Sequence, residues 1–128
     1  MSPQSPPVIA LIKLMGDTPR GPRREGVFAL WLTVRVAEDL LLLPPQPERA
    51  VRRRVAALER RLSSLSLPAP LRRGLVAVLA ELSDPRREKA GQVLQLLVAP
   101  AREALGGDAA EVLGRAARLA SQRPTTPS

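Results

Sequence analysis

The chain has 128 residues, the length of one ordinary domain, and a formal charge of +8. Nearly all of its positive charge is arginine, since Lys13 and Lys89 are the only lysines. Cys, His and Tyr are absent, which excludes disulfides, thiolate or imidazole metal sites, and nucleophiles activated by a histidine.

The composition favours helices over strands. Aromatic residues make up only 2% of the chain, so Leu, Val and Ala must fill its interior. Strands draw on aromatic and β-branched residues, and no long alternation of apolar and polar residues occurs in the sequence. We therefore predict an all-α fold, a compact bundle of five or six helices separated by short loops that many of the 14 prolines mark.

The two ends of the chain differ in composition from its middle. Residues 1–7 and 123–128 are rich in Pro, Ser and Thr, which predicts a disordered lead-in and a disordered tail. Residues 8–122 then form a single helical domain. Within it, 8–15 is a short apolar segment and 16–26 is a Gly/Pro/Arg loop.

Residues 8–15 are too few to hold a helix alone in water. The segment either packs on its own domain or docks on a partner, with Val8, Ile9, Ile12 and Leu14 as the candidate apolar anchors. Because the segment is short and contains Lys13, it is also a poor signal peptide, and we expect a cytoplasmic location.

Residues 26–43 are the stretch around which we expect the bundle to be arranged. They hold the only Phe, the only Trp and a closing run of four leucines. A helix that is apolar nearly all round is either a core helix or a membrane span. Arg35, Glu38 and Asp39 would be costly in lipid, and their spacing lets them share one solvated stripe. We therefore predict a soluble central helix, with Phe28 and Trp31 in the core and no membrane span.

Residues 47–65 carry the strongest charge pattern. Val51, Val55, Leu58, Leu62 and Leu65 recur at 4-3-4-3 spacing, which is typical of an amphipathic helix packed on a neighbour. At about 100° per residue, Arg49, Arg53 and Arg60 lie opposite this seam, with Arg54 and Arg61 on one flank. These five arginines are the candidate contacts to a partner or to phosphate.

Three further helices are predicted. The first covers 70–83, and Asp84 followed by Pro85 predicts a capped restart that runs to about residue 98. Pro100 is expected to kink or end that helix. Gly106-Gly107 separates it from a last helix over 109–122, which Asp108 and Glu111 would open as a capping box.

No pattern indicates an enzyme. A Gly-rich phosphate loop followed by Lys and Ser or Thr is missing. Glu38 and Asp39 are adjacent, so on a helix their side chains diverge by about 100° instead of converging. We predict no catalytic, cofactor-binding or metal-binding residues, and no cofactor.

Two functional interpretations remain, beside the alternative that the charge is only compositional. The first is a non-enzymatic interaction module, an adaptor, accessory subunit or regulator that uses its basic arginine face and an apolar surface on an acidic protein partner. The second is a nucleic-acid-binding protein that uses the same arginines on phosphate. In that case residues 70–98 resemble a helix-turn-helix in outline, with Arg86, Arg87 and Lys89 opening its second helix. A homo-oligomer is compatible with either interpretation.

Overall fold

The structure of the protein is a computed structural model that describes residues 5–42 and 45–122. Within these residues the chain forms seven helices and no strand. Leu97 alone separates two of them, which form one bent rod, so the prediction of an all-α bundle of five or six helices is confirmed. The helices are α1 (Pro6–Asp17), α2 (Pro22–Leu42), α3 (Glu48–Ser63), α4 (Ala69–Ser83), α5 (Ala90–Leu96), α6 (Val98–Leu105) and α7 (Gly107–Ser121).

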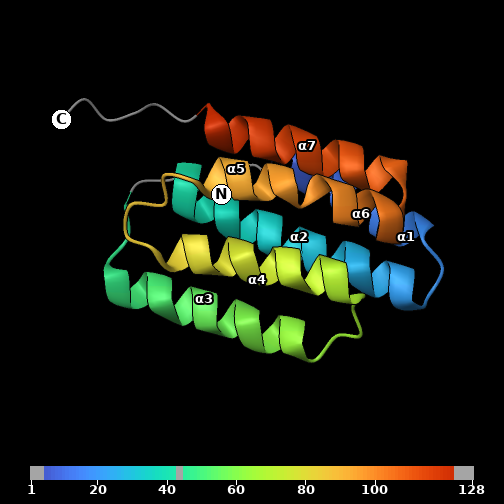
Figure 1. The fold of residues 1–128 in the computed structure, drawn as a ribbon, viewed down its shortest axis with the longest axis horizontal. Helices are drawn as coiled ribbons and strands as arrows, with labels where there is room; N and C mark the ends of the chain where they lie inside the picture. The colour runs from blue at the N-terminus through green and yellow to red at the C-terminus, as the bar shows by residue number, and fades with distance from the viewer. Residues whose placement is uncertain (1–4, 43–44, 123–128) are drawn as a thin grey trace.

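Successive rods run in alternating directions along the long axis of the molecule, and α1 and α2 lie behind the other helices in the view of Figure 1. Helix α2 is in contact with α1, α3, α4, α6 and α7. The prediction that the bundle is arranged around this helix is therefore confirmed. No helix within the described residues has both the length and the apolar character needed to cross a membrane.

The core consists of aliphatic and small side chains. Val27, Leu30, Val34 and Ala37 form the inner face of α2 and are almost fully buried. The prediction that Phe28 and Trp31 belong to the core is wrong, because both are only half-buried. Helical spacing places position 28 away from that inner face and position 31 on its flank, where Trp31 packs against the edge of the core. The largest fully buried side chains are Leu11, Leu30, Leu71, Leu75, Leu82, Leu94, Leu97 and Leu113.

Helix α1 is longer than predicted at both ends. The backbone N–H of Val8 donates to the Ser5 hydroxyl, and Pro6 occupies the first helical position, a favourable start for a helix. The predicted disordered lead-in is therefore wrong for residues 5–7, while residues 1–4 lie outside the described part of the chain. The predicted loop over 16–26 shrinks to 18–21. Helix α1 packs on α2 and α7, so the segment 8–15 belongs to the bundle.

The predicted helix restart at Asp84-Pro85 is wrong. Asp84 instead accepts a hydrogen bond from the backbone N–H of Arg86 at 2.9 Å, which forms a turn. Arg87 has a φ of 50°, outside the helical range. Residues 84–89 consequently form a loop, and α5 begins only at Ala90.

Pro100 interrupts the helix at Leu97, three residues before its own position. A proline ring clashes with the carbonyl four residues before it, here that of Leu96. Helix α5 ends at Leu96 and α6 begins at Val98. Gly106, with a φ of 99°, then joins α6 to α7. The predicted capping box is wrong, since Gly106 is the residue that precedes α7 and makes no side-chain cap.

Helices α5 and α7 approach each other at small residues. A Cβ atom added to Gly91 would lie 2.9 Å from the backbone nitrogen of Ser121 and 3.0 Å from its Cα. Gly91 is therefore required by this close contact between two backbones. Gly114, in the middle of α7, differs, because a Cβ atom there would meet nothing within 4 Å.

These two glycines form a matched pair for a stability measurement. We expect Gly91→Ala to lower the free energy of unfolding by about 1–3 kcal/mol, because the added methyl forces α5 and α7 apart. Gly114→Ala should raise it by about 0.5–1 kcal/mol through the better helix propensity of alanine. Urea denaturation followed by circular dichroism measures both, and equal effects of the two substitutions would contradict the close packing of α5 on α7.

Candidate interaction surfaces

The predicted arginines of α3 fall into two groups. Arg49, Arg53 and Arg60 are exposed, and none of them forms an ion pair with a carboxylate of the described residues. Arg49 and Arg53, together with the exposed Arg52, lie in the first two turns of α3. The helix dipole is positive at this end, so it adds to their charge instead of offsetting it.

Arg54 and Arg61 lie on the flank of α3 that faces α2. Arg54 pairs with Asp39 at 2.7 Å, and the guanidinium carbon of Arg61 lies 5.6 Å from the centre of the Phe28 ring. Both side chains therefore contribute to packing between the two helices. Asp39, which was expected to share a solvated stripe with Arg35, therefore pairs across the helix interface with Arg54.

A shallow groove runs along the exposed side of α3. Its volume is about 800 Å³, and Arg53 and Arg60 lie at its edges. The remaining lining residues are Ala56, Ala57, Glu59 and Ser63. The groove thus combines two guanidinium groups and one carboxylate with small side chains, and neither guanidinium pairs with a carboxylate of the described residues.

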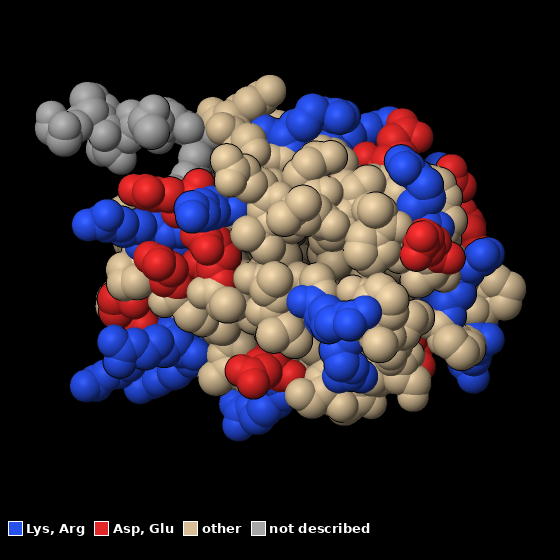
Figure 2. Space-filling model, viewed as in Figure 1, with Lys and Arg blue, Asp and Glu red and all other residues tan. Residues whose placement is uncertain are grey.

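The charges on the face seen in Figure 2 are unevenly distributed. Lys and Arg lie around most of its rim, including the top, right and lower edges, Asp and Glu are mixed with them at the left end, and the middle is largely uncharged. Val76 in α4 is 57% exposed and Leu96 in α5 is 75% exposed. Exposed apolar side chains beside a charged surface are typical of protein interaction sites.

The predicted apolar anchors of α1 also fall into two groups, one packed in the domain and one exposed. Val8 is buried in the core, and Leu14 is half-buried against it. The proposal that Val8 docks on a partner is therefore wrong, because its side chain already packs within the domain. Ile9, which is 52% exposed, and Ile12 face solvent and remain candidate anchors.

Arg72 and Arg87 bond to carbonyl groups of the fold, although the sequence suggested Arg87 for contacts to nucleic acid. Arg72 donates to the Leu65 carbonyl at 2.6 Å, beyond the end of α3. Arg87 donates to the Leu82 carbonyl at 2.9 Å and pairs with Glu48 at 3.2 Å. With Arg87 turned into the fold and α5 starting only at Ala90, the helix-turn-helix interpretation of residues 70–98 is wrong.

The outer face of α2 alternates arginine and aromatic residues. Arg24, Phe28, Trp31 and Arg35 follow one another at the spacing of a single helix face. The two rings stack with their centres 5.8 Å apart and an interplanar angle of 23°, and the guanidinium carbon of Arg35 lies 5.4 Å from the Trp31 ring. Sequence reasoning missed this surface because it placed both aromatic residues in the core.

Glu38 connects the start of α1 to α2. Its Oε1 accepts a hydrogen bond from the Ser5 hydroxyl, whereas its Oε2 is buried and has no donor among the described residues. Burial raises the pKa of the Glu38 carboxyl above its usual 4.5, the Ser5 hydroxyl opposes this shift, and the negative charge of Asp39 adds to it. The shift accompanies packing between two helices and does not by itself indicate catalysis.

Over residues 5–42 and 45–122, no three acidic side chains lie close enough together to hold a metal ion. Comparison with known proteins adds no functional information. No protein-family model matches the chain, and neither the curated proteins nor the solved structures contain a match. A function must therefore be inferred from the chemistry of the surfaces described above.

A pair of substitutions can distinguish the structural role of Arg87 from the effect of removing any arginine. We expect Arg87→Ala to lower the free energy of unfolding by about 1.5–3 kcal/mol, because carbonyl groups and a carboxylate lose a charged donor. Arg49→Ala, an exposed arginine without an ion pair, should change it by about 0.5 kcal/mol or less. Equal losses in urea denaturation would show that Arg87 does not hold the 84–89 loop in place.

The raised pKa of Glu38 predicts a pH-dependent stability. Because the folded state holds this proton more tightly than the unfolded chain, stability should fall as pH rises from about 4.5 through the folded-state pKa. Glu38→Gln keeps an oxygen that accepts from Ser5 but removes the titration. The variant should match the wild type near pH 4.5 and be more stable at pH 7. Parallel pH profiles of the two proteins in urea denaturation would contradict this prediction.

Proposed function

We propose that the protein is a non-enzymatic interaction module whose basic α3 surface binds an acidic protein partner. The observation that supports this most directly is the groove on α3, where Arg53 and Arg60 border Ala56 and Ala57. An acidic helix or extended peptide can place its carboxylates on the two guanidinium groups and its backbone over the small side chains.

The ion pairs of the described residues support this assignment. Arg54, Arg61, Arg72 and Arg87 are each used within the fold, whereas the outward arginines of α3 are left without an ion pair. Glu48, at the start of α3, is already engaged by Arg87. Glu59 is the one other carboxylate of α3, so the helix keeps an excess of positive charge, and such a surface attracts acidic partners from solution.

Exposed apolar residues on neighbouring helices would complete the interface. Val76 lies on α4, which packs on α3, and Leu96 lies on α5, which packs on α4; both side chains are outside the core. In this mechanism the arginines steer the encounter, and burial of these side chains slows dissociation. Nucleic acid remains the alternative, and the α3 groove has no aromatic residue in its lining on which a base could stack.

A charge reversal tests the role of the groove. A labelled helical peptide rich in Glu and Leu serves as the probe, and fluorescence anisotropy measures its affinity. We expect Arg53→Glu combined with Arg60→Glu to weaken binding at least about tenfold, because two attractive contacts become repulsive. The free energy of unfolding should stay within about 0.5 kcal/mol for each exposed site.

The matched control is Lys13→Glu combined with Arg102→Glu, which makes the same change in net charge on α1 and α6. Both residues are exposed, and neither pairs with a carboxylate of the described residues. This variant should bind the peptide much as the wild type does. If both variants weakened peptide binding equally, the effect would come from net charge and not from the α3 groove. If the wild type bound duplex DNA more tightly than the peptide, and if that affinity fell steeply with added salt, the nucleic-acid alternative would be favoured.

A further inference from the structure

A second basic site lies at the start of α2, away from the α3 groove. Met15 of α1, Arg20 and Gly21 of the loop, and Arg24 and Phe28 of α2 line a cavity of about 590 Å³, together with Pro22 and Glu25. This volume falls within the range of sites that bind small molecules. The cavity is a wide-open depression of the surface, and its lining includes two positively charged groups.

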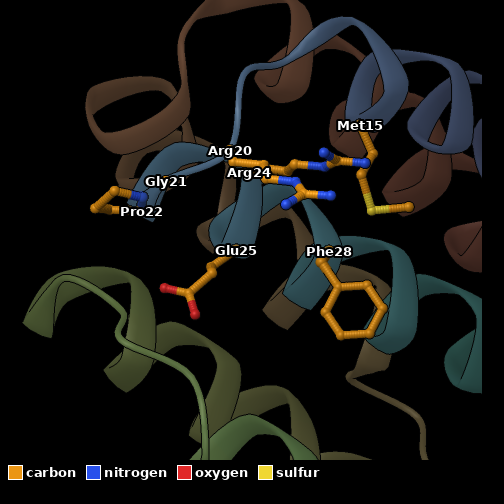
Figure 3. A pocket seen from close by; sticks show the side chains of 7 residues that line it. All are labelled: Met15, Arg20, Gly21, Pro22, Arg24, Glu25 and Phe28. Carbon is orange, nitrogen blue, oxygen red and sulfur yellow. The ribbon is translucent and has the colours of Figure 1, made fainter.

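The two arginines converge in this cavity. Figure 3 shows the side chains of Arg20 and Arg24 running side by side, with both guanidinium groups directed toward Met15. The Glu25 carboxylate points away from them, and neither arginine pairs with an acid of the described chain. Two like charges held together without a counter-ion favour an anion between them.

The wall opposite the guanidinium groups is apolar. The thioether of Met15 and the ring of Phe28 lie next to the arginine tips in Figure 3. Arg61 of α3 covers one face of the Phe28 ring, at 5.6 Å from its centre, and adds a third positive charge nearby. An occupant of the cavity would therefore meet positive charge on one side and apolar surface on the other.

From this geometry we infer that the cavity binds a small organic phosphate monoester, with its phosphate on Arg20 and Arg24 and its apolar body on Met15 and Phe28. A phosphate monoester carries a charge of about −1.5 to −2 at pH 7 and three acceptor oxygens. Two guanidinium forks match that charge and offer more donors than a single carboxylate can accept. The inference stands independently of the proposed function of α3, because it uses different residues.

The chain contains its own reporter for this site. Trp31 is the only Trp, and its ring stacks on that of Phe28 with 5.8 Å between centres. A ligand that contacts Phe28 should therefore change the fluorescence of Trp31. Titrations with phenyl phosphate, inorganic phosphate and phenol, all at constant ionic strength, test the phosphate and the apolar body separately.

We expect phenyl phosphate to change Trp31 fluorescence saturably and to bind at least about tenfold more tightly than inorganic phosphate or phenol. Arg20→Gln combined with Arg24→Gln should weaken phenyl phosphate by about tenfold or more. The control is Arg35→Gln, since Arg35 also lies beside Trp31 but does not line the cavity. That variant should retain the affinity of the wild type.

Phe28→Leu tests the apolar wall, with calorimetry as the readout and circular dichroism to verify folding. It should reduce the preference for phenyl phosphate over inorganic phosphate and leave inorganic phosphate binding unchanged. The inference would be overturned by equal affinities for phenyl phosphate and inorganic phosphate, by equal losses in the Arg20/Arg24 and Arg35 variants, or by the absence of a saturable signal.

Discussion

The fold depends on burying the inner face of α2 without any aromatic side chain. Val27, Leu30, Val34 and Ala37 lie on that face, and five other helices contact α2. Leu, Val and Ala side chains allow helices to approach closely. The closest approach is between α5 and α7, where the backbones at Gly91 and Ser121 are in contact. Phe28 and Trp31 are only half-buried, at the margin of this core, and each ring meets an arginine.

Arginine has four distinct roles in this structure. Arg72 and Arg87 bond to backbone carbonyls at the ends of α3 and α4, where helices leave acceptors unsatisfied. Arg35 and Arg61 lie over the aromatic rings of α2. Arg54 and Arg115 form ion pairs with Asp39 and Glu111. A last group, on the outward face of α3 and at the start of α2, forms no ion pair with a carboxylate of the described residues. Both functional proposals rest on that last group, because an exposed charge without a structural role is the one that a ligand can use at little cost to folding.

Local sequence signals were reliable only where tertiary contacts did not compete with them. A small polar residue followed by proline is a good helix start. At Ser5-Pro6 that signal opens α1. At Asp84-Pro85 the same signal produces a turn, because the side chain of Arg87 reaches back to the Leu82 carbonyl and across to Glu48. Hydrophobic spacing was more robust, since the seam from Val51 to Leu62 is buried throughout.

The sequence by itself determined the fold class, the central position of α2 and the outward orientation of Arg49, Arg53 and Arg60. Each of these follows from composition or from a repeat of about 3.6 residues, which the chain carries locally. Only the tertiary structure decided which arginines make contacts within the fold and which remain exposed. It alone brought Met15, Arg20, Arg24 and Phe28 around one cavity. The reason is that such groupings depend on how α1 and α3 pack against the flanks of α2. The hydrophobic periodicity of a single helix predicts which of its faces is buried, but not which other helix covers that face.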